Sequence, residues 1–386
     1  MTLAFVLFHY FPYGGLERDM LTMARTCAAR GHQVTIYTQS WEGDKPADIP
    51  VVILSTRAFT NHGRAQAFVK KFHALMQQQP KDLVIGFNKM PGLDVYYAAD
   101  VCFAQKAYEE RNWLYRLGGR SRHYLALEKA VFAQSQKTQI LLISPAQVPP
   151  FLRYYQTPAS RLHLLPPGIK RDRMMPDDYF QQRQSLRQQF GLAEDAWVML
   201  MVGSDFRRKG VARSIQALAA LPEKLRQRAY LWIAGQDNPQ RFLKLARELG
   251  VAERVNILGA RDDVPQLLWS ADVFLHPAHS EAAGAVLLES MIAGLPVITT
   301  EVCGYAHYVK QQEMGAVLTA LEADEKLADV IAELASRDAQ VWRERARNFI
   351  AHGDIFSMME HAADLIEHVG QNKQTSQCRE FLMDSV

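Results

Sequence analysis

The stretch Glu281-Ala282-Ala283-Gly284-Ala285-Val286-Leu287-Leu288-Glu289 sets two carboxylates eight residues apart, on either side of a turn of small residues. The apolar residues after Gly284 predict a helix, whose first backbone N–H groups lack partners within the helix and favour an anion such as a pyrophosphate. Along a helix, eight residues would separate the carboxylates by about 12 Å, comparable to the distance between the two sugars of a nucleotide sugar. We therefore predict that each glutamate accepts hydroxyl groups from one sugar. The alternative is a pair of solvated surface glutamates.

The composition is typical of an ordinary α/β protein. The chain has 386 residues, of which 48% are hydrophobic, enough for two sizeable cores. Its four cysteines lack the spacing of a disulfide scaffold or a zinc site, so we expect reduced thiols in a cytoplasmic protein. No apolar run is long enough to span a bilayer, and residues 3–8 are interpreted as a core strand rather than a signal peptide.

Short β-rich runs alternate with amphipathic segments, which is typical of parallel sheets covered by helices. Strands are expected in the first half near residues 3–8, 33–38, 51–54, 83–87 and 139–143. Strands are expected in the second half near residues 197–202, 230–234, 255–258, 273–276 and 296–299. The pattern predicts an α/β protein with two Rossmann-like, doubly wound domains, 1–168 and 169–353. A helix at about 354–369 is expected to pack back on the first domain, and residues 370–386 to form a disordered tail.

Neither half contains a Gly-x-Gly-x-x-Gly turn with an acidic residue at the usual distance, which argues against a dinucleotide-dependent dehydrogenase. Ligands of open α/β sheets bind beyond the carboxyl ends of the strands. Two such domains that face each other would therefore form an active-site cleft.

The order of the motifs resembles that of the retaining family 4 glycosyltransferases. Glu281 and Glu289 are followed by Gly294, and Arg208-Lys209 precedes Gly210, as in that family. Nearly the whole chain resembles the inner-core glucosyltransferases of lipopolysaccharide synthesis, on the stretches 10–15, 37–43, 86–94, 202–206 and 303–308. The resemblance implies the GT-B architecture, with the two domains facing across a cleft. It also implies transfer of glucose from UDP-glucose to a heptose of the lipid-anchored core, in an α linkage.

The resemblance implies a donor site mostly in the second domain. Its residues would be Gly15, Arg173, Arg208, Lys209, Arg261, Glu281, Ala282, Ala283, Gly284 and Glu289. Arg208 and Lys209 would stabilise the charge that develops on the leaving β-phosphate. Metal-dependent transferases use an Asp-x-Asp motif, which this chain lacks, so we expect no metal and no other cofactor. For Arg261, an ion pair with Asp262 or Asp263 is an equally good interpretation.

The candidate catalytic residues are Asp19, Asp100 and Glu281. Asp19 follows the Gly14-Gly15 turn, although the acidic residues there could simply complement a helix dipole. Asp100 stands where many relatives have a histidine, which leaves the catalytic base unassigned. We identify no pair of carboxylates of the glycosidase kind, and the favoured picture has the leaving phosphate take the acceptor proton.

Residues 104–130 concentrate the positive charge. Six basic and three acidic residues give this segment a charge of +3, which equals the formal net charge of the whole chain. Interleaved aromatic residues favour binding to an anionic membrane surface over binding to nucleic acid. The expected membrane-binding residues are Lys106, Arg111, Trp113, Tyr115, Arg116, Arg120, Arg122 and Lys129. The alternative is a solvated helix that packs its aromatic side chains inward.

These features predict an enzyme attached peripherally to the cytoplasmic face of the inner membrane. Its partners would be UDP-glucose, a lipid-anchored core oligosaccharide and anionic lipids, without nucleic acid. One rival hypothesis is the same fold with UDP-galactose or a UDP-N-acetylhexosamine as donor, since such sugars differ by single groups. The other is a catalytically idle protein that binds membrane surfaces.

Overall fold

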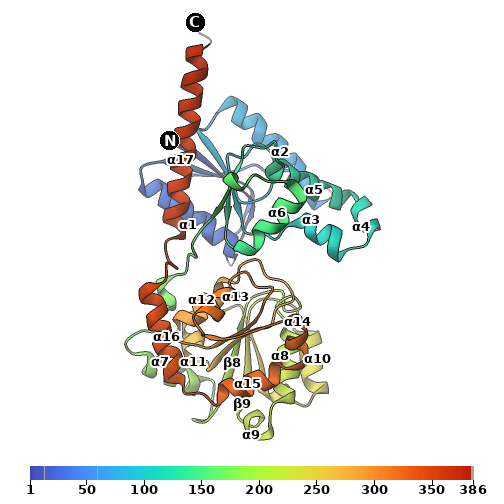
Figure 1. Cartoon of the computed structure of the whole chain (residues 1–386), viewed down its shortest axis with the longest axis vertical. Coiled ribbons are helices and arrows are strands. Elements are labelled where there is room, and N and C mark those ends of the chain that lie inside the picture. The colour runs from blue at the N-terminus through green and yellow to red at the C-terminus, as the bar shows by residue number, and fades with distance from the viewer. Residues whose placement is uncertain (13, 59, 384–386) are drawn as a thin grey trace. The chain divides into compact units, whose positions relative to one another are not determined.

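The structure, a computed structural model that describes residues 1–12, 14–58 and 60–383, contains two compact units (Figure 1). The first unit comprises residues 1–166 together with the C-terminal segment from Ser357, and the second comprises Pro167–Phe356. The boundaries expected from the sequence, at 168 and 353, lie two and three residues from these positions.

The first unit is built on a seven-stranded parallel sheet in the order β3-β2-β1-β4-β5-β6-β7. Its strands are β1 (Thr2–Tyr10), β2 (Gln33–Trp41), β3 (Val51–Ile53), β4 (Leu83–Gly86), β5 (Val95–Ala98), β6 (Gln139–Leu142) and β7 (Leu162–Leu164). The five predicted strands are confirmed, whereas β5 and β7 were missed. Strand β5 has only four residues and all are buried, so it shows no alternation of polar and apolar side chains.

Helices cover both faces of this sheet. They are α1 (Gly15–Ala29), α2 (Asn61–Gln78), α3 (Phe103–Gln105), η1 (Lys106–Glu110), α4 (Trp113–Leu117), α5 (Gly119–Phe132), η2 (Pro145–Gln147), α6 (Val148–Tyr155), η3 (Ala159–Arg161) and α17 (Met358–Met383). Tyr96 of β5 packs edge-on against Phe132 of α5, on the face that α2 and α6 also cover. The next residue, Tyr97, points to the opposite face and hydrogen-bonds to Asp19 of α1.

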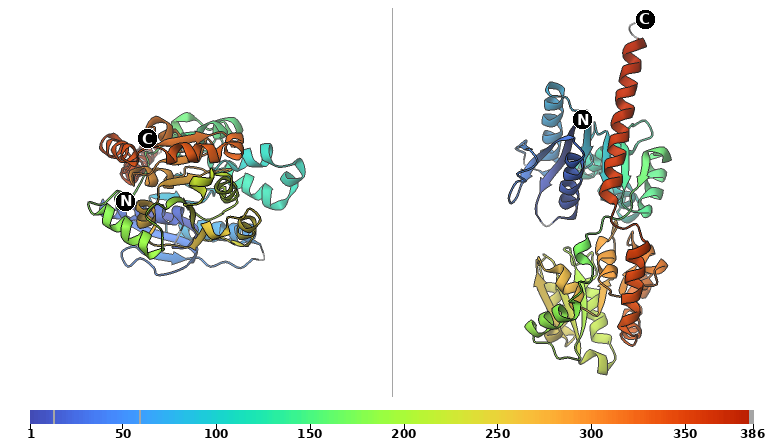
Figure 2. Two further views of the ribbon diagram at one scale, coloured as in Figure 1. Left: turned by 90° about the horizontal axis from the view of Figure 1, so that it is seen from below. Right: turned by 90° about the vertical axis from the view of Figure 1, so that its left-hand side faces the viewer.

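Helix α17 corrects the prediction of a disordered tail. The helix continues to Met383 and runs beside the sheet of the first unit (Figure 2), while residues 384–386 lie outside the described residues. Arg30 pairs with Asp364 at 2.6 Å, and Lys373 pairs with Asp94 at 2.8 Å. Gly370 permits the close approach, since a Cβ there would lie 2.2 Å from the sulfur of Met1. Tertiary contacts therefore extend the helix into a polar sequence.

The second unit holds a six-stranded parallel sheet in the order β10-β9-β8-β11-β12-β13. Its strands are β8 (Trp197–Val202), β9 (Ala229–Ala234), β10 (Val255–Gly259), β11 (Val273–His276), β12 (Val297–Thr300) and β13 (Gly315–Leu318). All five predicted strands are confirmed, and β13 was missed. The helices are η4 (Arg171–Arg173), α7 (Tyr179–Gln189), α8 (Val211–Ala220), α9 (Glu223–Arg226), α10 (Gln240–Glu248), η5 (Ala252–Arg254), α11 (Val264–Ser270), α12 (Ala285–Ile292), α13 (Ala306–Gln311), α14 (Ala320–Glu325), α15 (Leu327–Ala335) and α16 (Ala339–His352).

Both sheets reverse their strand order beside their first strand. The reversal lies between β1 and β4 in the first unit and between β8 and β11 in the second. Ligands of open α/β sheets bind at such a switch point, beyond the carboxyl ends of the strands. The segments that follow these four strands are therefore the places to look for the site in each unit.

Candidate active site

In the second unit, the turn after β8 packs tightly against the loop after β11. Gly210 has a φ of +80°, and a Cβ on it would lie 2.1 Å from the carbonyl oxygen of Pro277. The backbone N–H of His279 donates to the carbonyl of Arg208 at 2.8 Å. Only glycine fits both the backbone conformation and this approach. The turn thus carries Arg208 and Lys209 to the end of β11.

Glu281 lies at the centre of the charged cluster that results. Its Oε2 accepts a hydrogen bond from Lys209, one from Arg208 at 3.2 Å, and one from the ring of His276 at 3.2 Å. The structure therefore brings together three of the predicted donor residues. The buried ring of His276 contacts Glu281 from inside the unit.

The environment of Glu281 keeps it ionised. Burial alone would raise the pKa of this carboxyl, but the hydrogen bond from His276 and the charges of Lys209 and Arg208 outweigh it, so the pKa lies far below its ordinary value. Burial lowers the pKa of His276, which keeps the ring neutral at neutral pH. The cluster therefore combines a fixed anion with two fixed cations and a neutral hydrogen-bond donor.

The helix that follows begins later than a single helix from Glu281 to Glu289 would require. Gly284 adopts a φ of +84° and caps α12, whose first residue is Ala285. Glu281 instead forms an isolated parallel bridge with Cys303. The 12 Å estimate for a shared helix was therefore wrong, because the left-handed glycine separates the loop from the helix. Ala282 and Ala283 lie in the loop directly before α12, and their binding to a diphosphate stays a prediction.

Glu289 is buried on α12 and faces Arg173. The guanidinium Nε of Arg173 lies 3.5 Å from a carboxylate oxygen of Glu289, and this Nε is buried without a hydrogen-bond partner among the described residues. Arg173, one of the predicted donor residues, thus lies beside Glu289, one of the two glutamates expected to bind a sugar. A ligand hydroxyl that bridges the two groups from the side would give each a hydrogen-bond partner.

Arg261 forms an ion pair with Asp263, which is the alternative to base binding that the sequence left open. Its Nε and Nη2 donate to the two carboxylate oxygens of Asp263, at 2.7 and 2.5 Å. The structure shows Arg261 engaged in this bidentate pair, and a role in base binding stays a prediction.

In the first unit, the two residues predicted at the Gly14-Gly15 turn, Gly15 and Asp19, have different surroundings. Gly15 opens α1 with open space around its Cβ position. Asp19 accepts a hydrogen bond from the hydroxyl of Tyr97 at 2.9 Å. A cavity of the first unit lies beyond the carboxyl ends of its strands, and Asp19 does not line it. Glu17 lines the cavity instead. This residue was interpreted only as a possible complement to the helix dipole.

Glu17 folds back over the turn that precedes it. A Cβ on Gly14 would lie 1.7 Å from the Oε2 of Glu17, so a glycine at this position makes room for the carboxyl. Glu17 is only 6% exposed. Burial, together with the neighbouring charges of Asp100 and Asp19, raises its pKa. A carboxyl of this kind is suited to hydrogen-bonding a sugar hydroxyl.

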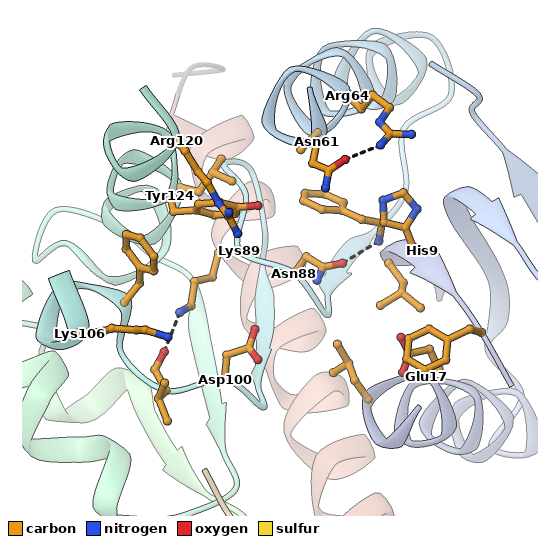
Figure 3. A pocket seen from close by; sticks show the side chains of 18 residues that line it. His9, Glu17, Asn61, Arg64, Asn88, Lys89, Asp100, Lys106, Arg120 and Tyr124 are labelled. Atoms are coloured by element: carbon orange, nitrogen blue, oxygen red, sulfur yellow. Dashed lines mark hydrogen bonds between the residues drawn. The ribbon is translucent and has the colours of Figure 1, made fainter. Parts of the chain in front are cut away.

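The cavity has a volume of about 680 Å³ and lies beyond the carboxyl ends of β1, β4 and β5 (Figure 3). Asp100 lines it, as its predicted role requires, together with Asn88 and Lys89 from the segment after β4. The side-chain oxygen of Asn88 accepts the backbone N–H of Phe8 at 2.6 Å. Asn88 and Lys89 were not predicted as site residues. Their position directly after a strand was the available signal.

The predicted membrane-binding segment divides into two parts. Lys106 and Arg120 line the cavity. Trp113 is 62% exposed, and Leu114 and Leu117 on the same short helix are also exposed, so this part does not pack its apolar side chains inward. Among the described residues, no helix is long and apolar enough to cross a membrane.

No metal centre is evident in the described parts of the chain. Within residues 1–12, 14–58 and 60–383, no group of three or more His, Cys, Asp or Glu side chains is arranged to hold a metal ion. The charged groups at the switch point of the second unit are Glu281 and the two side chains that pair with it, Arg208 and Lys209.

Two models of glycosyltransferase families match the chain. The family described as Glycosyl transferases group 1 matches residues 182–352, and Glycosyltransferase Family 4 matches residues 13–173. The chain is 46% identical over 368 residues to the lipopolysaccharide glucosyltransferase WaaG of Escherichia coli K12, a match that covers 95% of this chain and 98% of that relative. The chain belongs to the family 4 glycosyltransferases.

Solved structures agree with this assignment. This family 4 glycosyltransferase is similar to a crystal structure of WaaG, described as a glycosyltransferase involved in lipopolysaccharide biosynthesis, with a TM-score of 0.88 and 45% identity over 94% of this chain and 99% of the other. The structure of Anabaena HepE in complex with UDP-glucose shares the fold, with a TM-score of 0.73 at 20% identity over 95% of this chain and all of that one. The protein is a glycosyltransferase with the GT-B architecture.

Proposed function

We propose that this glycosyltransferase transfers glucose from UDP-glucose to a heptose of the lipopolysaccharide inner core, with retention of configuration and without a metal ion. The observation that carries the proposal is the 46% identity to WaaG, a lipopolysaccharide glucosyltransferase, along nearly the full length of both chains. The charged cluster at the switch point of the second unit supports it chemically.

In this proposal the second unit binds the donor. Cleavage of the bond between glucose and the diphosphate leaves negative charge on the β-phosphate. Arg208 and Lys209 would stabilise that charge in the place of a metal ion, because fixed cations need little reorganisation as the charge develops. Glu281 holds both cations in position and would orient the hydroxyls of glucose.

The ribose would lie between Glu289 and Arg173. A buried carboxylate accepts hydroxyl donors, and the Nε of Arg173, which lacks a hydrogen-bond partner, would donate to a ribose oxygen. The backbone of Ala282, Ala283 and Gly284 would meet the diphosphate before α12.

The first unit would supply the acceptor site in its cavity. Glu17 and Asp100 are the carboxyl groups that would orient the attacking hydroxyl. Because we identify no carboxyl group that would act as a nucleophile, we propose that the leaving phosphate itself takes the acceptor proton. The exposed α4 and the basic residues beside it would attach the enzyme to anionic lipids of the cytoplasmic membrane face.

The test is a transfer assay with three donors in parallel. The purified protein is mixed with heptose-terminated core lipopolysaccharide and with UDP-glucose, UDP-galactose or UDP-N-acetylglucosamine, and both UDP release and the acceptor mass are measured. We expect the acceptor to gain one hexose fastest from UDP-glucose. Faster transfer from another donor would reject glucose, and no transfer from any donor would favour a protein that only binds membrane surfaces.

A further inference from the structure

The cavity of the first unit gathers cations that have few acidic partners. Four basic side chains line it: Arg64, Lys89, Lys106 and Arg120. In the part of the chain that the structure describes, Lys89 is the only one of the four that forms an ion pair. On the outside of the same unit, by contrast, Arg25 pairs with Asp48 and Arg30 with Asp364. The cavity therefore holds three basic side chains, Arg64, Lys106 and Arg120, that form no ion pair among the described residues.

Lys89 is held firmly in the cavity wall. Its ammonium group donates to Glu128 at 2.5 Å and to the carbonyl of Val101 at 3.3 Å. Glu128 is fully buried, and it also accepts the backbone N–H groups of Phe103 and Ala104, both at 2.8 Å. One buried carboxylate thus fixes both Lys89 and the start of the segment that carries Lys106. The wall is built in advance of any ligand.

The charges in the cavity are separated. In Figure 3, Arg64 and Arg120 lie in the upper part of the cavity, and the carboxyl groups of Glu17 and Asp100 lie in the lower part. The tip of Lys89 points toward the carbonyl of Val101, to which it donates a hydrogen bond. Carboxylates accept sugar hydroxyls and repel anions, whereas arginine and lysine bind phosphate and carboxylate oxygens by charge-assisted hydrogen bonds. An occupant that suits both parts carries hydroxyl groups at one end and negative charge at the other.

We propose that this cavity recognises an anionic substituent of the acceptor, a phosphate or a sugar carboxylate, through Arg64, Lys89, Lys106 and Arg120, in addition to the hydroxyls of the sugar that receives glucose. The inference rests on the proposed function and adds a charge requirement to it. The volume of about 680 Å³ lies in the range of small-ligand sites. A neutral acceptor would leave Arg64, Lys106 and Arg120 without an ion-pair partner, so the anion should raise affinity for the acceptor without changing affinity for the donor.

The test uses a water-soluble, deacylated core oligosaccharide that ends in heptose, so that membrane attachment plays no part. Three forms are compared: untreated, treated with phosphatase, and with its carboxyl groups reduced to alcohols. The enzymes are the wild type, Arg64→Gln, Arg120→Gln, and Lys70→Gln as the matched control. Lys70 is exposed on α2, the helix that carries Arg64, and it does not line the cavity.

We expect each cavity variant to raise the KM for the untreated oligosaccharide about tenfold, with the KM for UDP-glucose unchanged and the control like the wild type. Removal of the recognised anion should raise the wild-type KM by a similar factor and make the variants nearly equal to the wild type. A loss after phosphatase treatment alone identifies a phosphate, and a loss after reduction alone identifies a carboxylate.

Two results would overturn this inference while glucose transfer stands: all three forms serving the wild type equally well, or the variants losing the same factor with every form. Absence of transfer to every form would instead reject the proposed function. A thermal unfolding midpoint for each variant within a few degrees of the wild type excludes misfolding as the cause of a change.

Discussion

The donor cluster of the second unit (Arg208, Lys209 and Glu281) and the cavity of the first unit occupy equivalent places in their sheets. They differ in whether their basic side chains form ion pairs within the protein. In the donor cluster, Arg208 and Lys209 both bind Glu281, so the cations are held by the protein itself. In the cavity, Arg64 and Arg120 form no ion pair among the described residues. The first arrangement suits a group whose charge develops during reaction, and the second suits a ligand that arrives charged.

The largest expected effect concerns the donor cluster. We expect Lys209→Gln to lower kcat by about 10²- to 10³-fold, because loss of one fixed donor to the leaving phosphate costs roughly that factor. Steady-state kinetics with UDP-glucose at saturating acceptor measures it. Lys224→Gln, an exposed lysine on α9, is the matched control. A drop smaller than fivefold would show that Lys209 serves only to hold Glu281.

Two glycine substitutions sharpen the comparison between the units. Gly210→Ala forces a Cβ against the backbone carbonyl of Pro277 at a φ of +80°, so we expect a loss of about 1–3 kcal/mol in stability. Gly14→Ala meets the flexible end of Glu17 and the side chain of Phe11, whose Cζ would lie 2.9 Å from the new Cβ, but no backbone atom, and its φ of −82° suits alanine. We expect the second variant to keep its unfolding midpoint but to raise the KM for the acceptor several-fold.

Thermal unfolding and acceptor kinetics on both variants check this pair. The account is contradicted if Gly14→Ala is as destabilising as Gly210→Ala, or if it leaves acceptor kinetics unchanged. Gly15→Ala is the control for this pair, since nothing lies within 4 Å of its Cβ position and we expect the variant to fold like the wild type.

The pH dependence of stability tests His276. Burial holds its pKa below the ordinary 6.5, so the folded state disfavours the protonated ring. The stability that depends on the neutral ring is present above pH 6.5 and falls as the pH drops below that value, by at most about 1.4 kcal/mol per pH unit for one proton. Calorimetric unfolding at pH 7.5, 6.5 and 5.5 should show a smaller acid loss for His276→Gln. Equal losses would mean that His276 does not titrate as described.

The smallest effect concerns the exposed part of the basic segment. Trp113→Ala should weaken binding to vesicles with anionic lipid by a few-fold, because an exposed tryptophan contributes apolar area at the interface. Leu321→Ala, which removes an equally exposed apolar side chain from the second unit, is the control. Equal vesicle binding by Trp113→Ala and wild type would remove α4 from the membrane proposal.

The two regions also differ in how well the sequence predicted them. The donor cluster comes from two short stretches, 203–210 and 276–289, so local motifs and a family resemblance were sufficient to find it. The cavity wall comes from residues spread from Leu7 to Leu127, brought together by strands β1, β4 and β5 and helix α5. No local spacing reveals such a set. Glu17 and Lys89 were therefore missed, and Lys106 and Arg120 were predicted only for the membrane.

The errors in the fold have similar physical causes. Strands β5, β7 and β13 have three or four residues, too few to show a period, and the equally short β3, β4, β6, β11 and β12 were predicted from their β-rich composition instead. The C-terminal helix was ended too early because its polar sequence lacks an apolar face after 370, while its contacts with the first unit lie far away in sequence. Predictions failed where long-range contacts override local pattern.

The central claim is that protein cations replace a metal ion at the donor phosphates. The most direct measurement is the initial rate of glucose transfer by the wild-type enzyme, followed through the acceptor mass, in EDTA and in excess magnesium. The account predicts equal rates, with a gain of one hexose in both. A rate abolished by EDTA and restored by magnesium would contradict it.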